Sequence, residues 1–247
     1  MASLVYPFVG PLVINCLLTI GVCYYMIKSS VYRSPITYFS FLATLSALLG
    51  SIFNAAVYMD WSRYYTLRSA MSILSVISTS SLFVPGLIGF HRISKQKDNK
   101  AGVYISVVGY LWAFVLSLMV IVVYAMFEIQ GSIDSYYVRY VLAYGHCGLA
   151  FLVVVLCLMT HQYLHGKAKK SLIAYTSLFI IFEIFFFIVS FAVRSGVAYY
   201  GLTLVFIDFA TALAVLISVM YGHLWTAMDD LSETDSHEKL EVGSSQA

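Results

Sequence analysis

Charged residues are scarce in this sequence. Only 11% of its 247 residues are charged, whereas 61% are hydrophobic, and the mean hydropathy is +0.86. Soluble domains carry about 25% charged residues, so this chain has too few to cover a water-facing surface. The net charge of +2 does not indicate nucleic-acid binding, because the basic residues lie in short loops. The composition predicts an integral membrane protein whose main partner is the lipid bilayer.

The cysteines, lysines and sequence motifs exclude several kinds of chemistry. All four cysteines lie inside apolar stretches, so we expect neither a disulfide framework nor a cysteine metal site. No nucleophile motif, phosphate-binding loop or dinucleotide fingerprint occurs. No lysine lies within an apolar stretch, so a retinal Schiff base has no attachment point. We therefore expect a protein that is not an enzyme and that holds no cofactor or metal.

Seven long apolar stretches run along the chain. They cover residues of about 3–27, 36–59, 69–90, 103–127, 136–164, 171–193 and 199–225. Each exceeds the length of about 20 residues that a helix needs to cross a bilayer, and none alternates as a barrel strand does. The sequence predicts an all-α bundle of seven transmembrane helices over residues 1–227, then a disordered acidic cytoplasmic tail over residues 228–247. Pro35 is expected to begin a helix, and Pro85 predicts a kink inside the third one.

The positions of lysine and arginine predict the orientation. The loops after the first, third and fifth stretches hold nine of these residues, and the loops after the second, fourth and sixth hold four. Cytoplasmic loops carry the excess of positive charge. We expect the N-terminus outside, the C-terminus in the cytoplasm, and residence in the plasma membrane rather than an endomembrane.

Three ionisable residues interrupt the last three apolar stretches: His146, Glu183 and Asp208. At a rise of about 1.5 Å per residue, all three lie roughly 14–17 Å below the outer surface. Ionisable groups at such depth are costly, so their convergence indicates a ligand-binding or proton-relay site, which Thr211 joins as a helical neighbour of Asp208. The alternative is that each residue only forms interhelical hydrogen bonds, worth about 0.6–2 kcal/mol each.

A histidine pair is a weaker signal. His161 and His165 stand four residues apart within the fifth stretch, and on one helix this spacing can bind a metal ion. No carboxylate motif accompanies them, so ordinary histidines at the membrane interface are the preferred interpretation.

Several short motifs resemble those of rhodopsin-like G-protein-coupled receptors, of which nematode chemoreceptors are one divergent group. They are Asn15 in the first helix, R-S-P-I-T-Y-F at residues 33–39, His91-Arg92 at the end of the third helix, Trp112 in the fourth, and Tyr221 in the last. The resemblance implies a ligand site within the bundle and contact of Arg92 with a heterotrimeric G protein. The sequence departs from that family at Ile217-Ser218, where the family has Asn-Pro, and in the second helix, which lacks aspartate.

Two other families share local features with the chain. The run Asp208-Phe209-Ala210-Thr211-Ala212 is similar to the last helix of microbial rhodopsins, with Ala212 in the place of the retinal lysine. The segments 146–151 and 223–229 resemble the Frag1/DRAM family of multispanning membrane proteins, which has six helices and a larger outer loop.

Three functions follow from these observations. The first is a receptor that binds a small ligand in the outer half of the bundle and signals to the cytoplasm. The second is a proton-coupled small-molecule transporter that uses the ionisable trio as a relay. The third is a non-catalytic membrane scaffold or lipid-handling protein.

Overall fold

The computed structural model describes residues 2–28, 34–60, 64–130, 135–192 and 211–225, and all regular structure within them is helical. The elements are α1 (Ala2–Lys28), α2 (Pro35–Met59), α3 (Tyr64–Gln96), α4 (Lys100–Gln130), α5 (Ser135–Thr160), the 3₁₀ turn η3 (His161–Tyr163) and α6 (Gly166–Ala192). A shorter apolar helix, Thr211–Tyr221, completes the described chain and is called the C-terminal helix below. The all-α prediction is confirmed for these ranges.

Five helical segments in the described ranges are long and apolar enough to cross a membrane. They are Val9–Lys28, Pro35–Val57, Ser69–Gln96, Lys100–Val123 and Tyr144–Tyr163. The prediction of a multi-pass membrane protein is thereby supported. Part of the seventh apolar stretch, residues 199–210, and the acidic tail, residues 228–247, lie outside the described residues.

Local sequence explains where several helices begin and end. Pro35 is the first residue of α2, as expected, and the Ser34 side chain caps the helix by accepting a hydrogen bond from the Thr37 N–H at 3.4 Å. α3 ends in a tight turn at Asp98, whose φ of 49° is left-handed. The Asn99 N–H bonds to the Ser94 carbonyl at 2.8 Å, which satisfies one of the last carbonyls of α3.

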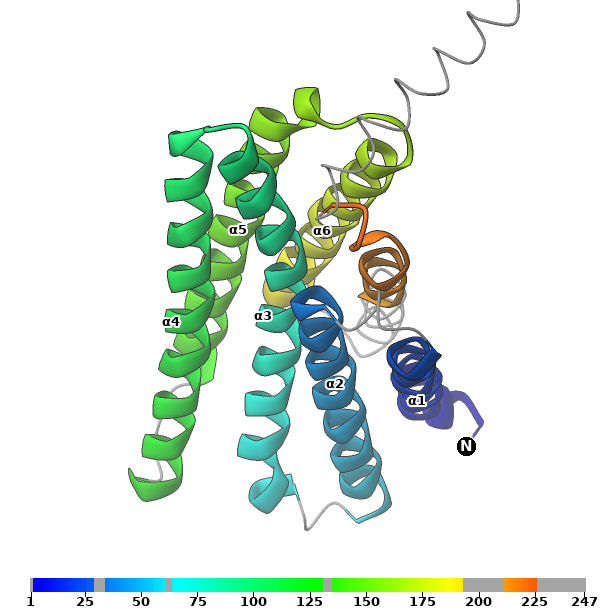
Figure 1. The fold of residues 1–247 in the computed structure, drawn as a ribbon. Helices are drawn as coiled ribbons and strands as arrows, with labels where there is room; N and C mark the ends of the chain where they lie inside the picture. Colours follow the sequence, from blue (N-terminus) through cyan, green and yellow to red (C-terminus); the bar gives the residue numbers. More distant parts are fainter. Residues whose placement is uncertain (1, 29–33, 61–63, 131–134, 193–210, 226–247) are drawn as a thin grey trace, which may run out of the picture.

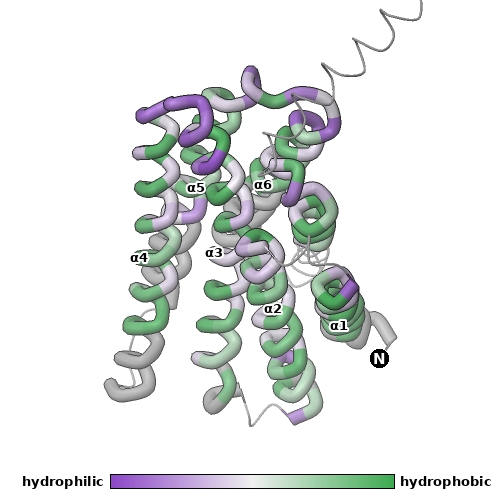
Figure 2. Tube along the Cα trace, viewed as in Figure 1, coloured by the Kyte–Doolittle hydropathy of each residue, from purple (hydrophilic) through white to green (hydrophobic). Residues whose placement is uncertain are grey.

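α2, α3, α4 and α5 run alternately up and down with α3 at the centre of the bundle, while α1 is inclined to them and is seen nearly end-on (Figure 1). α3 contacts α2, α4, α5 and α6, while α1 contacts α2. The C-terminal helix reaches α2 through a hydrogen bond of 2.8 Å between Ser218 and Ser40. The helices are apolar along most of their length, and hydrophilic residues gather at the end that carries the α3–α4 and α5–α6 connections (Figure 2). α3 is therefore the described element on which α2, α4, α5 and α6 all pack.

Candidate functional site

His146 lies in the interior, where α3, α5 and α6 meet. Its side chain on α5 is only 1% exposed, and its ring centroid is 6.1 Å from that of Phe83 on α3. The Phe83 ring is in turn 4.5 Å from the Phe179 ring on α6. A titratable side chain thus sits inside the bundle, as the sequence predicted, and it contacts an aromatic pair that joins the other two helices.

The rest of the predicted polar site is only partly described. Glu183 lies in α6, one helical turn beyond Phe179, but its side chain is outside the described part of the structure, and so is all of Asp208. Thr211 is half-buried at the start of the C-terminal helix. The convergence of His146, Glu183 and Asp208 therefore stays a prediction.

A tyrosine that the sequence argument did not single out bridges α6 and α3. Proline has no N–H, so Pro85 leaves a carbonyl of the preceding turn of α3 without its helical partner. Beside this proline, the Tyr175 hydroxyl donates to the Leu82 carbonyl and accepts from the Gly86 N–H, the latter at 3.3 Å. Leu82 and Gly86 are the pair that a regular α-helical hydrogen bond joins. One side chain from α6 thus serves both backbone groups of this turn of α3.

Gly86 is required for this approach. A Cβ atom at position 86 would lie 2.6 Å from Cε1 of Tyr175, closer than real side-chain contacts come. A buried tyrosine also needs a partner for its hydroxyl. The sequence offers two signs of this contact, a tyrosine in one apolar stretch and a Pro-Gly pair in another. Neither predicts that the two meet, because that depends on how α3 and α6 pack.

Trp225 extends the contact towards the hydrophilic end of the bundle. The side chain is fully buried, its ring lies 5.2 Å from the Tyr175 ring, and its Nε1–H donates to the Ser171 Oγ at 2.9 Å. Gly89 on α3 provides the space, because a Cβ there would lie 3.3 Å from the indole. Trp225 therefore packs against both α3 and α6.

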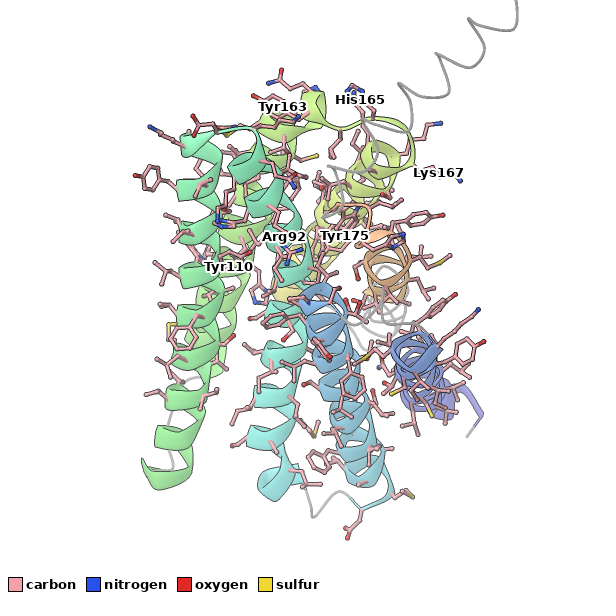
Figure 3. All side chains as sticks on the ribbon, in the orientation of Figure 1. Arg92, Tyr110, Tyr163, His165, Lys167 and Tyr175 are labelled. Atoms are coloured by element: carbon pink, nitrogen blue, oxygen red, sulfur yellow. The ribbon has the colours of Figure 1, made fainter. Side chains whose placement is uncertain are left out.

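Arg92 lies at the hydrophilic end of α3, where it was expected to meet a cytoplasmic partner. Its side chain is exposed, and Figure 3 labels it together with Tyr110 of the neighbouring α4. The neighbouring His91 Nδ1 is 2.9 Å from the Ser106 Oγ. Since the Ser106 hydroxyl donates to the Val103 carbonyl at 2.8 Å, His91 is the donor in that pair. The base of Arg92 is thus fixed by α4, while its guanidinium group faces outward.

Other polar side chains of the sequence join neighbouring helices. Asn15 on α1 donates to Ser51 on α2 at 3.1 Å, and Ser78 on α3 donates to the Ala43 carbonyl on α2 at 2.9 Å. For these residues the interpretation as interhelical hydrogen bonds holds.

Trp112 has a similar role between α4 and α5. Its Nε1–H donates to the Gly145 carbonyl at 3.0 Å, and a Cβ at Gly148 would lie 2.7 Å from the indole ring. Two glycines one turn apart therefore let the tryptophan of α4 approach the α5 backbone directly.

The idea of a histidine pair on one helix is wrong. α5 ends at Thr160, and His161 begins the η3 turn, where its Nδ1 is 2.7 Å from the Leu158 carbonyl. His161 and His165 are therefore not neighbours on a helical face. Within the ranges that the structure describes, no cluster of three metal-ligating side chains is found.

Comparison with known proteins gives no family for this chain. No protein-family model matches the sequence, and no curated protein is similar to it. The resemblance to G-protein-coupled receptors rests on the short motifs alone.

Proposed function

We propose that the protein is a seven-helix membrane receptor that binds a small ligand in the outer half of its bundle and signals at its cytoplasmic end. The observation that carries this proposal is the Tyr175 bridge. It joins α6 to α3 beside Pro85, directly next to the aromatic pair that contacts His146. A ligand that binds beside His146 of α5 and displaces α6 would act on this bridge.

The charge distribution supports the orientation that a receptor needs. The basic residues of the α3–α4 and α5–α6 connections are Arg92, Lys95, Lys97, Lys100, Lys167, Lys169 and Lys170. They lie at or near the end of α3, the start of α4 and the start of α6, the end of the bundle where hydrophilic residues gather (Figure 2), and positive charge favours the cytoplasmic side. This end faces the cytoplasm in our proposal, with the N-terminus outside and the protein in the plasma membrane.

A route for the signal runs down the inner half of the bundle. Tyr175 contacts Trp225, and Trp225 packs on Gly89, three residues before Arg92. A conformational switch requires two discrete arrangements, and in our proposal these are α3 with and without the two hydrogen bonds to Tyr175. Arg92 would then contact a heterotrimeric G protein in one of them.

Nucleotide exchange tests the proposal. Membranes that contain the full chain are incubated with heterotrimeric G proteins and a library of small molecules, and exchange is compared with that of Arg92→Ala. A receptor gives ligand-dependent exchange that Arg92→Ala abolishes.

The same variants separate the alternatives. A transporter gives pH-dependent flux that survives Arg92→Ala and is lost in Asp208→Asn. A scaffold tolerates both substitutions, and either outcome contradicts the receptor proposal.

A further inference from the structure

The connection between α5 and α6 combines a fixed backbone with an outward-facing row of positive charge. Leu164 is 1% exposed, Ala168 is buried, and the buried Ser171 accepts the hydrogen bond of Trp225. Between these anchors, Lys167 and Lys170 are exposed. The ammonium groups are therefore held at the surface by a segment that packs into the core.

The segment that carries these lysines has no carboxylate of its own. The sequence contains no aspartate or glutamate between residues 135 and 182. Lys167, Lys169 and Lys170 fall within four residues, and His165 precedes them as a further exposed polar side chain. Figure 3 shows His165 and Lys167 directed away from the helices. Like charges at this spacing repel one another unless an anion is bound.

The same segment borders apolar side chains that face outward. Ile173, one turn beyond Lys169, is 40% exposed, and Leu158, just before η3, is 65% exposed. In a membrane these side chains contact acyl chains, so the lysines lie at the depth of the headgroups. A phospholipid can contact both kinds of surface at once, whereas a soluble acidic protein reaches only the lysines.

We infer that residues 161–170, which run from the η3 turn into the first turns of α6, bind the headgroup of an anionic phospholipid. The polyanionic phosphoinositide headgroup suits three clustered lysines best. The site is separate from Arg92, and its binding chemistry can be measured without a G protein. The assignment of this end to the cytoplasm rests on the proposed function, but the binding itself does not.

The α3–α4 turn provides a matched control. It also carries three lysines, Lys95, Lys97 and Lys100, but Asp98 stands among them. The control variant is Lys95→Gln with Lys97→Gln and Lys100→Gln, and the test variant is Lys167→Gln with Lys169→Gln and Lys170→Gln. Both variants remove the same charge from the same end of the bundle.

Binding is measured on the purified full chain in a neutral detergent, with dioctanoyl phosphatidylinositol 4,5-bisphosphate as the probe. Each lysine near an anionic headgroup contributes about 1 kcal/mol, or about fivefold in affinity. The test variant should therefore bind on the order of a hundredfold more weakly, while the control variant and the Lys→Arg version of the test variant stay within about fivefold of the wild type. Equal binding by wild type and test variant overturns the inference, and so does equal loss in the control.

Two further probes distinguish a lipid from its headgroup alone. Dioctanoyl phosphatidylcholine should not compete, and inositol 1,4,5-trisphosphate should bind more weakly than the lipid because it lacks acyl chains. If the trisphosphate binds as well as the lipid, the surface is not a lipid site.

Acetylation of lysine amines in the wild type is a measurement that needs no variant. The lipid should protect Lys167, Lys169 and Lys170 from acetylation but not Lys95 and Lys97. Equal protection of all five lysines contradicts the assignment.

Discussion

The Tyr175 hydroxyl on α6 accepts a hydrogen bond of 3.3 Å from the backbone N–H of Gly86 on α3. The same hydroxyl donates to the Leu82 carbonyl. In lipid, a backbone group without a partner costs several kcal/mol, and residues next to an intramembrane proline depend on neighbouring helices for their hydrogen bonds. Tyr175 bonds to the backbone of α3 at Leu82 and Gly86, next to Pro85, so moving α6 away from α3 would break both hydrogen bonds.

Replacing Tyr175 by phenylalanine should lower stability by about 1–3 kcal/mol, because the Leu82 and Gly86 groups lose the hydroxyl that serves them. The measurement is thermal unfolding of the purified protein in detergent. Tyr104→Phe is the control, since Tyr104 is 70% exposed on α4, and it should leave the midpoint unchanged. Equal midpoints for the two variants would show that the bridge contributes no stability.

Alanine at two glycines should have opposite effects. Gly86→Ala brings a methyl group to 2.6 Å from the Tyr175 ring, which should cost about 1–3 kcal/mol through overpacking. Gly21 on α1 has no atom within 4 Å of the added methyl group, so Gly21→Ala should stabilise the helix by about 0.5–1 kcal/mol. The same unfolding assay reports both, and a stabilising Gly86→Ala would refute the close approach of α6.

A double-mutant cycle should detect the contact between α2 and the C-terminal helix. The Ser40 and Ser218 hydroxyls are 2.8 Å apart, and interhelical hydrogen bonds in membranes contribute about 0.6 kcal/mol on average and about 1.7 at most. Ser40→Ala, Ser218→Ala and the double variant should therefore show a coupling energy in this range. A coupling near zero would mean that the two helices are not in contact in the membrane.

Asp98→Gly should stabilise the turn between α3 and α4. Asp98 has a left-handed φ of 49°. This conformation lowers the stability by about 1–2 kcal/mol at most for a residue with a side chain, and it carries no such cost for glycine. Asp98→Val, at the same position, should destabilise the protein, because β-branched residues tolerate this region least. Unfolding midpoints in the opposite order would contradict the Schellman-type end of α3.

Much of the fold was predictable from local sequence. Runs of apolar residues longer than a bilayer span predict transmembrane helices because the backbone must satisfy its own hydrogen bonds in lipid. Pro35 predicted the start of α2 for an equally local reason. The actual helices extend beyond the apolar stretches, for example α3 to Gln96 and α6 back to Gly166, because helical hydrogen bonding does not stop where hydrophobicity does.

The contacts between helices inside the bundle could not be predicted from the sequence. α5 ends at Thr160, where no proline marks the end in the sequence. The apolar stretch therefore predicts a helix that continues past this residue. The bridge between Tyr175 and the Pro85 turn joins residues 89 positions apart, and only the packing of α3 against α6 brings them together. His146 was correctly expected in the interior, whereas its meeting with Glu183 and Asp208 remains a prediction.

Water access to Asp208 tests the account most directly, because a ligand site in the outer half of the bundle must open to the outside. Asp208→Cys is introduced into a chain whose four cysteines are replaced by alanine or serine, and intact cells are treated with a membrane-impermeant methanethiosulfonate reagent. Leu216→Cys, at a position 38% exposed on the C-terminal helix and expected to face lipid, is the control. We predict rapid modification at position 208 from the outside and none at position 216. If position 208 is not modified from either side, the receptor account is contradicted, and Asp208 is an internal residue with a structural role.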